Sequence, residues 1–178
     1  ARTVLETHGP RGFCARAISS LAGISQGRLL QYFKSLDDVA FEAYAEWINE
    51  EFRIRGAAAT GATPRERLAN LLTCGYERDL NGPQVMRQIS RYSWFWPVET
   101  EERFAVHADK VEGLIAAILA PLAPKAEPER LQMAAIGVLG IYMAVLRRST
   151  VLGWTPSFAS ARATELCGPI LDGLEAKG

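Results

Sequence analysis

A short apolar pattern interrupted by one glycine, in residues 14–34, constrains the fold of this chain more than any other feature. Residues 15–21 can form a short helix, and Gly23 can take the left-handed conformation that ends it. Ser25 can then cap a second helix that opens at Gln26. Apolar residues at helical spacing would give both helices one small core, namely Ile18, Leu21, Ala22, Ile24, Leu29, Tyr32 and Phe33. This pattern predicts a helix-turn-helix.

The second helix keeps polar side chains away from that core. Gln26, Arg28 and Gln31 carry the donors and acceptors that read base edges in the major groove of duplex DNA. We assign Arg16 and Arg28 to base or phosphate contacts and Gln26 to a base edge. The side chains expected to hold the DNA backbone are Ser25, Gln31, Tyr32 and Lys34.

The distribution of charge supports a nucleic-acid interface, although the net charge of the whole chain is zero. Residues 1–36 carry five basic side chains and one acidic side chain, which gives a charge of +4 (5 − 1). Residues 37–52 carry six acids and no base. Such a polarity would orient the N-terminal end toward phosphates, whereas a charge run taken alone is often only a solvated face.

At these positions the sequence resembles the TetR (tetracycline-repressor-like) family of transcriptional regulators. The matching residues are Gly9, Phe13, Cys14, Ile18, Ala22-Gly23-Ile24-Ser25, Gly27-Arg28-Leu29, Tyr32-Phe33-Lys34 and Asp37-Asp38. The resemblance implies a DNA-binding helix-turn-helix that includes Gly27, a homodimer and a small-molecule effector. Leu30 and Leu36 depart from the family pattern, which usually has a tyrosine and often a basic residue there.

The length and composition indicate a folded, all-α protein. The chain has 178 residues, of which 48% are hydrophobic and 22% are charged, and it shows little strand-like alternation. We expect a three-helix head in residues 1–36, a linking helix in residues 37–55 that is long enough to join head and body, and a helical effector-binding and dimerisation domain in residues 56–178. Because the chain begins part-way through the expected first helix, residues 2–7, we expect its N-terminus to be incomplete.

Several long helices are predicted in the body. Their expected ranges are residues 64–79, a segment that ends before Pro97, residues 100–122, residues 129–152 and residues 157–177. Gly168-Pro169 should bend or break the last helix. By their order in the chain, the last two helices correspond to the dimer interface of the family. The uncharged residues 133–146 are too few for a membrane span, so we expect a helix buried on nearly all sides and no membrane segment.

Residues 92–96, YSWFW, are the strongest sequence signal for a small-molecule site. Aromatic side chains at that density can line an apolar pocket, although ordinary core packing is the simpler explanation. His107 could supply a polar anchor, or it could be a surface or core histidine. The candidate effector-binding residues are Met86, Trp94, Phe95, Trp96, His107 and Tyr142.

The leading functional hypothesis is a repressor that an apolar or aromatic small-molecule effector releases from a palindromic DNA operator. A homodimer is expected because one short helix reads too few base pairs to select an operator in a genome. The first alternative is an effector-independent DNA-binding or scaffold protein.

The second alternative, a helical enzyme, has little support in the sequence. There is no metal-ligand spacing, nucleophile elbow or phosphate-binding glycine loop, and His8 and His107 are far apart. We therefore expect no catalytic residue, metal or cofactor. The three cysteines show no metal-like pairing, which suits reduced thiols in the cytoplasm.

Overall fold

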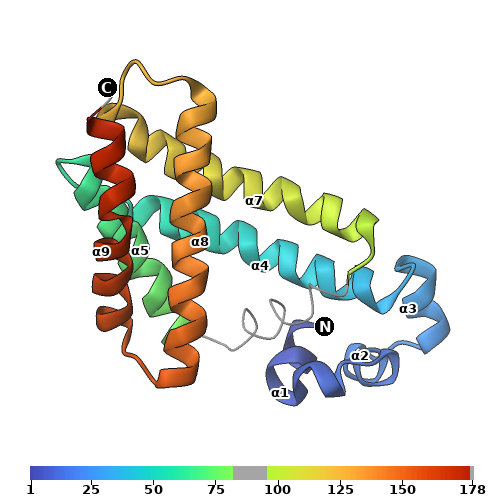
Figure 1. Cartoon of the computed structure of the whole chain (residues 1–178). Helices are drawn as coiled ribbons and strands as arrows, with labels where there is room; N and C mark the ends of the chain where they lie inside the picture. Colours follow the sequence, from blue (N-terminus) through green and yellow to red (C-terminus); the bar gives the residue numbers. More distant parts are fainter. Residues whose placement is uncertain (82–95, 177–178) are drawn as a thin grey trace. The chain divides into compact units, whose positions relative to one another are not determined.

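The computed structural model describes residues 1–81 and 96–176, and every regular element in these two ranges is a helix (Figure 1). The prediction of an all-α chain is therefore confirmed for this part. The described helices are α1 (Arg2–Gly12), α2 (Ala15–Ala22), α3 (Gln26–Tyr32), α4 (Leu36–Ala58), α5 (Pro64–Asn81), α7 (Val98–Leu119), the short 3-10 helix η1 (Ala120–Leu122), α8 (Pro128–Leu152) and α9 (Pro156–Glu175).

The chain divides into two compact units. Unit 1 comprises Ala1–Glu50 and Pro83–His107, and unit 2 comprises Glu51–Gly82 and Ala108–Gly178. The helices α4 and α7 each contribute residues to both units. The functional boundaries expected at residues 36 and 55 stay a prediction.

Aromatic and aliphatic side chains fill the core of unit 1. The helices α1 to α3 contribute buried residues such as Leu5, Ile18 and Leu29, while α4 contributes Phe41 and Tyr44. Three residues expected in this core are instead exposed: Leu21 and Tyr32 keep 60% and 70% of their surface in solvent, and Ala22 is exposed as well. A helix of only two turns has one narrow buried face, and in each helix another apolar residue occupies it.

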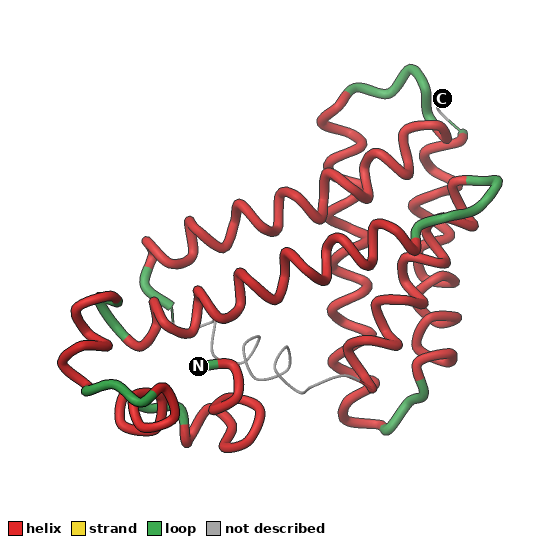
Figure 2. Tube along the Cα trace, turned by 180° about the vertical axis from the view of Figure 1, so that it is seen from behind, coloured by secondary structure: helices red, strands yellow, loops and turns green. Residues whose placement is uncertain are grey.

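Three long helices, α5, α8 and α9, lie side by side in unit 2, as the opposite views of Figures 1 and 2 both show. Their ends follow local rules: Pro128 and Pro156 open α8 and α9, and Gly153 ends α8 in the left-handed conformation (φ 68°). The side chain of Thr155 caps α9 by accepting a hydrogen bond from the backbone N–H of Phe158. The core between these helices includes Leu68, Tyr76, Val138, Ala163 and Cys167.

Two expectations about these helices are overturned, the first of them in part. The helix α9 is not broken at Pro169, because its packing against α5 and α8 outweighs the backbone hydrogen bond that proline removes, while a bend at Gly168-Pro169 stays a prediction. The helix α8 is not buried on nearly all sides, since Met133, Ile136 and Met143 are exposed. Its inward face, including Ala135 and Val138, is fully buried.

By length and composition alone, α8 could cross a membrane. One 18-residue window has a mean hydropathy of 1.4, and 33% of that window is buried inside the protein. This test alone is weak evidence for a membrane span, and the buried face of α8, which includes Ala135 and Val138, belongs to the core of unit 2.

Candidate functional site

The helix-turn-helix forms as the sequence predicts. Gly23 ends α2 in the left-handed conformation (φ 66°, ψ 29°), and the backbone N–H of Ile24 donates to the carbonyl of Ser19 at 3.0 Å. The side chain of Ser25 then caps α3 by accepting a hydrogen bond from the backbone N–H of Arg28 at 3.1 Å. These local bonds fix where α2 ends and α3 begins.

All eight residues predicted to contact DNA are exposed to solvent. They are Arg16, Ser25, Gln26, Gly27, Arg28, Gln31, Tyr32 and Lys34. On the opposite faces of the two helices, Ile18 and Leu29 are each 3% exposed and join the core of unit 1. The helix α3 therefore presents a polar surface while its apolar side holds it against the protein. Leu30, which is 52% exposed, shares this outer surface.

Two of the predicted effector-binding residues belong to unit 1. Trp96 is 7% exposed and lies in an aromatic cluster with Phe41, Tyr44 and Phe104, at ring-centroid distances of 5.8 to 6.2 Å. Its indole nitrogen is buried and has no hydrogen-bond partner within residues 1–81 and 96–176. The ring of His107 lies 6.0 Å from that of Phe41.

The other four candidates are placed differently. Tyr142 belongs to unit 2, whereas Met86, Trp94 and Phe95 lie outside the described residues. The structure thus brings Trp96 and His107 into one aromatic environment, and it assigns Tyr142 to a separate, polar one.

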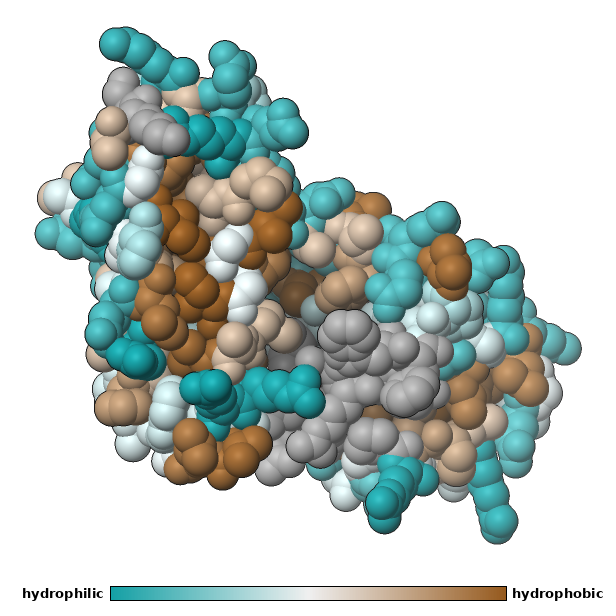
Figure 3. Space-filling view, viewed as in Figure 1, coloured by the Kyte–Doolittle hydropathy of each residue, from teal (hydrophilic) through white to brown (hydrophobic). Residues whose placement is uncertain are grey.

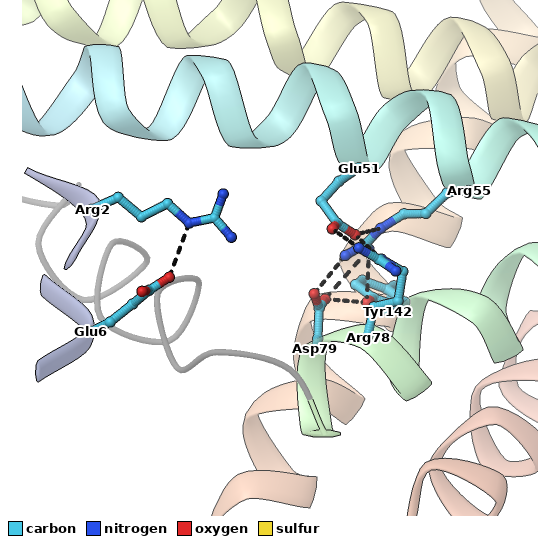
Figure 4. A network of polar contacts seen from close by, with 7 residues as sticks. All are labelled: Arg2, Glu6, Glu51, Arg55, Arg78, Asp79 and Tyr142. Atoms are coloured by element: carbon cyan, nitrogen blue, oxygen red, sulfur yellow. Dashed lines mark hydrogen bonds and ion pairs between the residues drawn. The ribbon is translucent and has the colours of Figure 1, made fainter.

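Tyr142 is part of a buried polar network in unit 2, drawn in Figure 4 and formed by Glu51, Arg55, Arg78, Asp79 and Tyr142. The hydroxyl of Tyr142 donates to the carboxylate of Asp79 and accepts from the guanidinium of Arg55 at 3.1 Å. Arg55 also donates to Asp79 at 2.5 Å and to Glu51 at 3.3 Å.

Arg78 closes the network by donating two hydrogen bonds to Glu51, at 2.6 and 2.5 Å. Two arginines therefore balance two carboxylates, and the buried carboxylates of Glu51 and Asp79 are both paired, although the side chain of Arg78 itself is 39% exposed. The hydroxyl of Tyr142 has two hydrogen-bond partners, Asp79 and Arg55. Tyr142 therefore contributes to the connection between α4, α5 and α8.

The pKa values follow from this arrangement. Burial raises the pKa of Tyr142 well above its ordinary value, and the nearby charge of Asp79 adds to the effect. For Glu51, burial alone would raise the pKa, but the hydrogen bonds from Arg78 and the charge of Arg55 outweigh it and lower the pKa. Tyr142 therefore stays neutral and Glu51 stays ionised near neutral pH.

Four members of the network were missed by reasoning from the sequence. Glu51 and Arg55 are four residues apart, and this spacing was the only local signal. Arg78 and Asp79 lie near the end of α5, where charged residues are ordinary. Their pairing depends on the packing of three helices, which no spacing along the chain reveals.

An all-α chain with this N-terminal helix-turn-helix and these long C-terminal helices has the fold of TetR-type transcriptional regulators, which confirms the resemblance at the level of the fold. No protein-family model matches the sequence, and no curated protein matches it significantly.

Solved structures are similar over nearly the whole chain. The chain is similar to the transcriptional regulator FadR from Bacillus subtilis in complex with stearoyl-CoA, with a TM-score of 0.77 and 14% identity over 94% of this chain and 93% of that one. It is also similar to a TetR transcription regulator from Haloarcula marismortui, with a TM-score of 0.71 and 16% identity over 97% and 92%. For the TetR family regulator PfmR from Thermus thermophilus, the TM-score is 0.60, with 18% identity over 98% and 96%. These proteins are named as transcriptional regulators rather than enzymes.

Proposed function

We propose that this chain is a sequence-specific DNA-binding transcriptional regulator in which α3 enters the major groove. The single observation that carries the proposal is the two-sided character of α3. Leu29 holds this helix to the core, while Gln26, Arg28 and Gln31 are exposed beside a Ser25 cap that fixes where the helix starts. Arginine and glutamine side chains on such a surface can form bidentate hydrogen bonds with base edges.

The proposed regulator acts as a homodimer through α8 and α9. Figure 3 shows hydrophobic side chains gathered over these two helices. The exposed apolar residues there are Met133, Ile136, Met143, Val151, Leu152, Phe158 and Leu166. Gly140, whose missing side chain would face open space, belongs to the same stripe of α8 and would allow another backbone to approach closely. An exposed apolar surface of this kind is typical of a protein interface.

The proposed effector is an apolar or aromatic small molecule, and its binding releases the operator. Two observations support an effector of this kind: the aromatic surroundings of Trp96 and the stearoyl-CoA present in the structure of the Bacillus subtilis regulator. Release requires the effector to bind the free conformation more tightly than the DNA-bound one. This role implies a protein of the cytoplasm that represses its target genes.

The DNA-binding proposal is tested by selecting binding sites from random duplex DNA and then measuring affinity by gel shift. Arg28→Ala should weaken binding to the selected site by about 1–3 kcal/mol and relax the preference at one base position. Lys34→Ala should weaken binding to all sequences and lower the salt slope by about one unit. Arg53→Ala removes an exposed arginine of α4 and serves as the control. A wild-type chain that selects no sequence would refute the proposal.

The effector proposal is tested separately with stearoyl-CoA and shorter acyl-CoAs as the first probes. Binding would be followed by fluorescence of the four tryptophans, and release by the gel shift of the selected site. We expect a ligand that changes the fluorescence also to weaken DNA binding. A ligand that binds while operator affinity stays unchanged would favour an effector-independent DNA-binding protein.

A further inference from the structure

The guanidinium of Arg103, on α7, contacts three residues on one face of α4. It donates to the carboxylate of Asp38 at 2.7 Å and to that of Glu42, and its carbon lies 4.1 Å from the ring centroid of Phe41. Asp38, Phe41 and Glu42 are spaced by three and four residues, so they share one side of the helix. All four residues belong to unit 1, together with the helix-turn-helix.

Asp38 extends this contact to the end of α3. One oxygen of its carboxylate accepts from Arg103, and the other accepts from the backbone N–H of Lys34 at 3.1 Å. Lys34 directly follows Phe33, which caps the C-terminus of α3. The side chain of Ser35 accepts a hydrogen bond from the backbone N–H of Asp38 at 3.1 Å. The Asp38 carboxylate therefore holds the junction through which α3 passes into α4.

The guanidinium of Arg103 is held in place by the buried ring of Phe41. Phe41 is 4% exposed, and its ring packs edge-on against Trp96 at 5.9 Å. A guanidinium is planar and can stack on an aromatic ring while its nitrogen atoms serve two carboxylates. A lysine could supply the charge, but it could not supply this geometry.

The charge of Arg103 has a second effect. Asp38 and Glu42 are acids close in sequence to the positively charged head, residues 1–36. Unpaired, both carboxylates would weaken the attraction between the head and phosphates. Arg103 offsets this negative charge.

We propose that Arg103 is a positioning residue for DNA binding: it fixes the α3–α4 junction through Asp38 and neutralises two acids beside the head without contacting DNA. This inference rests on the proposed function and adds a determinant of affinity outside the helix-turn-helix. It assigns a role to an arginine that lies 65 residues from Asp38 along the chain.

The chain offers a closely matched control for this proposal. Arg65 in unit 2 also bridges two carboxylates, those of Asp172 and Glu175, and its side chain is 40% exposed, as is that of Arg103. Arg65→Met and Arg103→Met therefore remove similar ion pairs at different places. We expect Arg103→Met to lower affinity for the selected DNA site about tenfold, because each of two heads loses about threefold. Arg65→Met should leave affinity unchanged.

Arg103→Lys separates geometry from charge. It keeps the positive charge and should lose only part of the affinity, and this loss should persist at high salt because it reflects geometry. Arg103→Met should lose more DNA affinity than Arg103→Lys, and this difference between the two variants should shrink as salt is added. If Arg103→Met does not fold, the comparison of Arg103→Lys with wild type at low and high salt still tests the proposal.

A direct readout is hydrogen exchange at the backbone amide of Lys34, followed by NMR in the protein without DNA. Exchange should become faster in both Arg103 variants and stay unchanged in Arg65→Met. Unchanged DNA affinity together with unchanged Lys34 exchange in the Arg103 variants would overturn this inference and leave the proposed function intact. If the wild-type chain selects no DNA sequence, the proposed function is refuted, and the role of Arg103 is refuted with it.

Discussion

Tyr142 and Asp79, 63 residues apart in the chain, share a buried hydrogen bond in which the tyrosine hydroxyl donates to the carboxylate. The side chain of Asp79 is fully buried, and Arg55 bonds to both residues. The polar network thereby ties the C-terminal part of α4 to α5 and α8 at a point where the surrounding side chains are largely apolar. Removal of one member leaves charges or polar atoms unpaired inside the protein.

Asp79→Asn should lower the free energy of unfolding by about 3 kcal/mol, because the buried charge of Arg55 loses one partner. Tyr142→Phe, which removes only a hydroxyl, should cost about 1–2 kcal/mol. Urea unfolding of the purified variants measures both values. Asp172→Asn, at an exposed ion pair, is the control and should change stability by less than about 1 kcal/mol. If Asp79→Asn lowered the free energy of unfolding no more than Asp172→Asn does, the network would contribute nothing to stability.

Gly75→Ala should destabilise the protein even though alanine favours helices. An added Cβ at position 75 would lie 2.9 Å from the Tyr142 hydroxyl oxygen and 3.0 Å from a ring carbon. Displacing this ring should cost about 1–3 kcal/mol. Gly113→Ala on α7 meets no atom within 4 Å and should instead stabilise by about 0.5–1 kcal/mol. Thermal unfolding of the two variants should give shifts of opposite sign, and shifts of equal sign would contradict this packing.

Glu51 should make stability depend on acid pH. Its pKa in the folded protein is lowered from the ordinary value of 4.5, so its stabilising effect is present above that value and is lost as the pH falls through the folded-state pKa. Glu51→Gln should be less stable than wild type at neutral pH, and the difference should shrink below about pH 4. Unfolding curves at a series of pH values test this prediction. A difference that stays constant across the series would mean that Glu51 gains no stabilisation from its arginines.

The exposed apolar face of α8 should control dimerisation. Ile136→Glu places a charge where the side chain is 45% exposed, on a face of α8 that also exposes Met133 and Met143. We expect the variant to shift from twice the chain mass to 19.5 kDa in light scattering after gel filtration. Val106→Glu, at an exposed apolar residue of α7 in unit 1, should stay dimeric. Wild-type chains that are monomeric at all concentrations would contradict the proposed interface.

The helix-turn-helix could be predicted because its determinants are local. Gly23 ends α2 and Ser25 caps α3 through hydrogen bonds between residues at most five positions apart, so spacing alone locates both helices. The long helices were also predicted, since each carries an apolar stripe at helical spacing. Periodicity is a property of the chain itself, and it needs no knowledge of the partner that a helix packs against.

The tertiary structure decided which residues meet. The acidic residues 37–52 looked like one negative segment, yet Asp38 and Glu42 pair with Arg103, and Glu51 pairs with Arg55 and Arg78. Leu21 and Tyr32 have core spacing and are nevertheless exposed. Helical spacing predicts which side chains share a face of a helix. The residues that pack against that face depend on contacts between parts of the chain that are far apart in the sequence. For this reason the sequence alone determined the helices and the candidate DNA-binding surface, whereas only the tertiary structure decided the positions of Arg103 and the polar network.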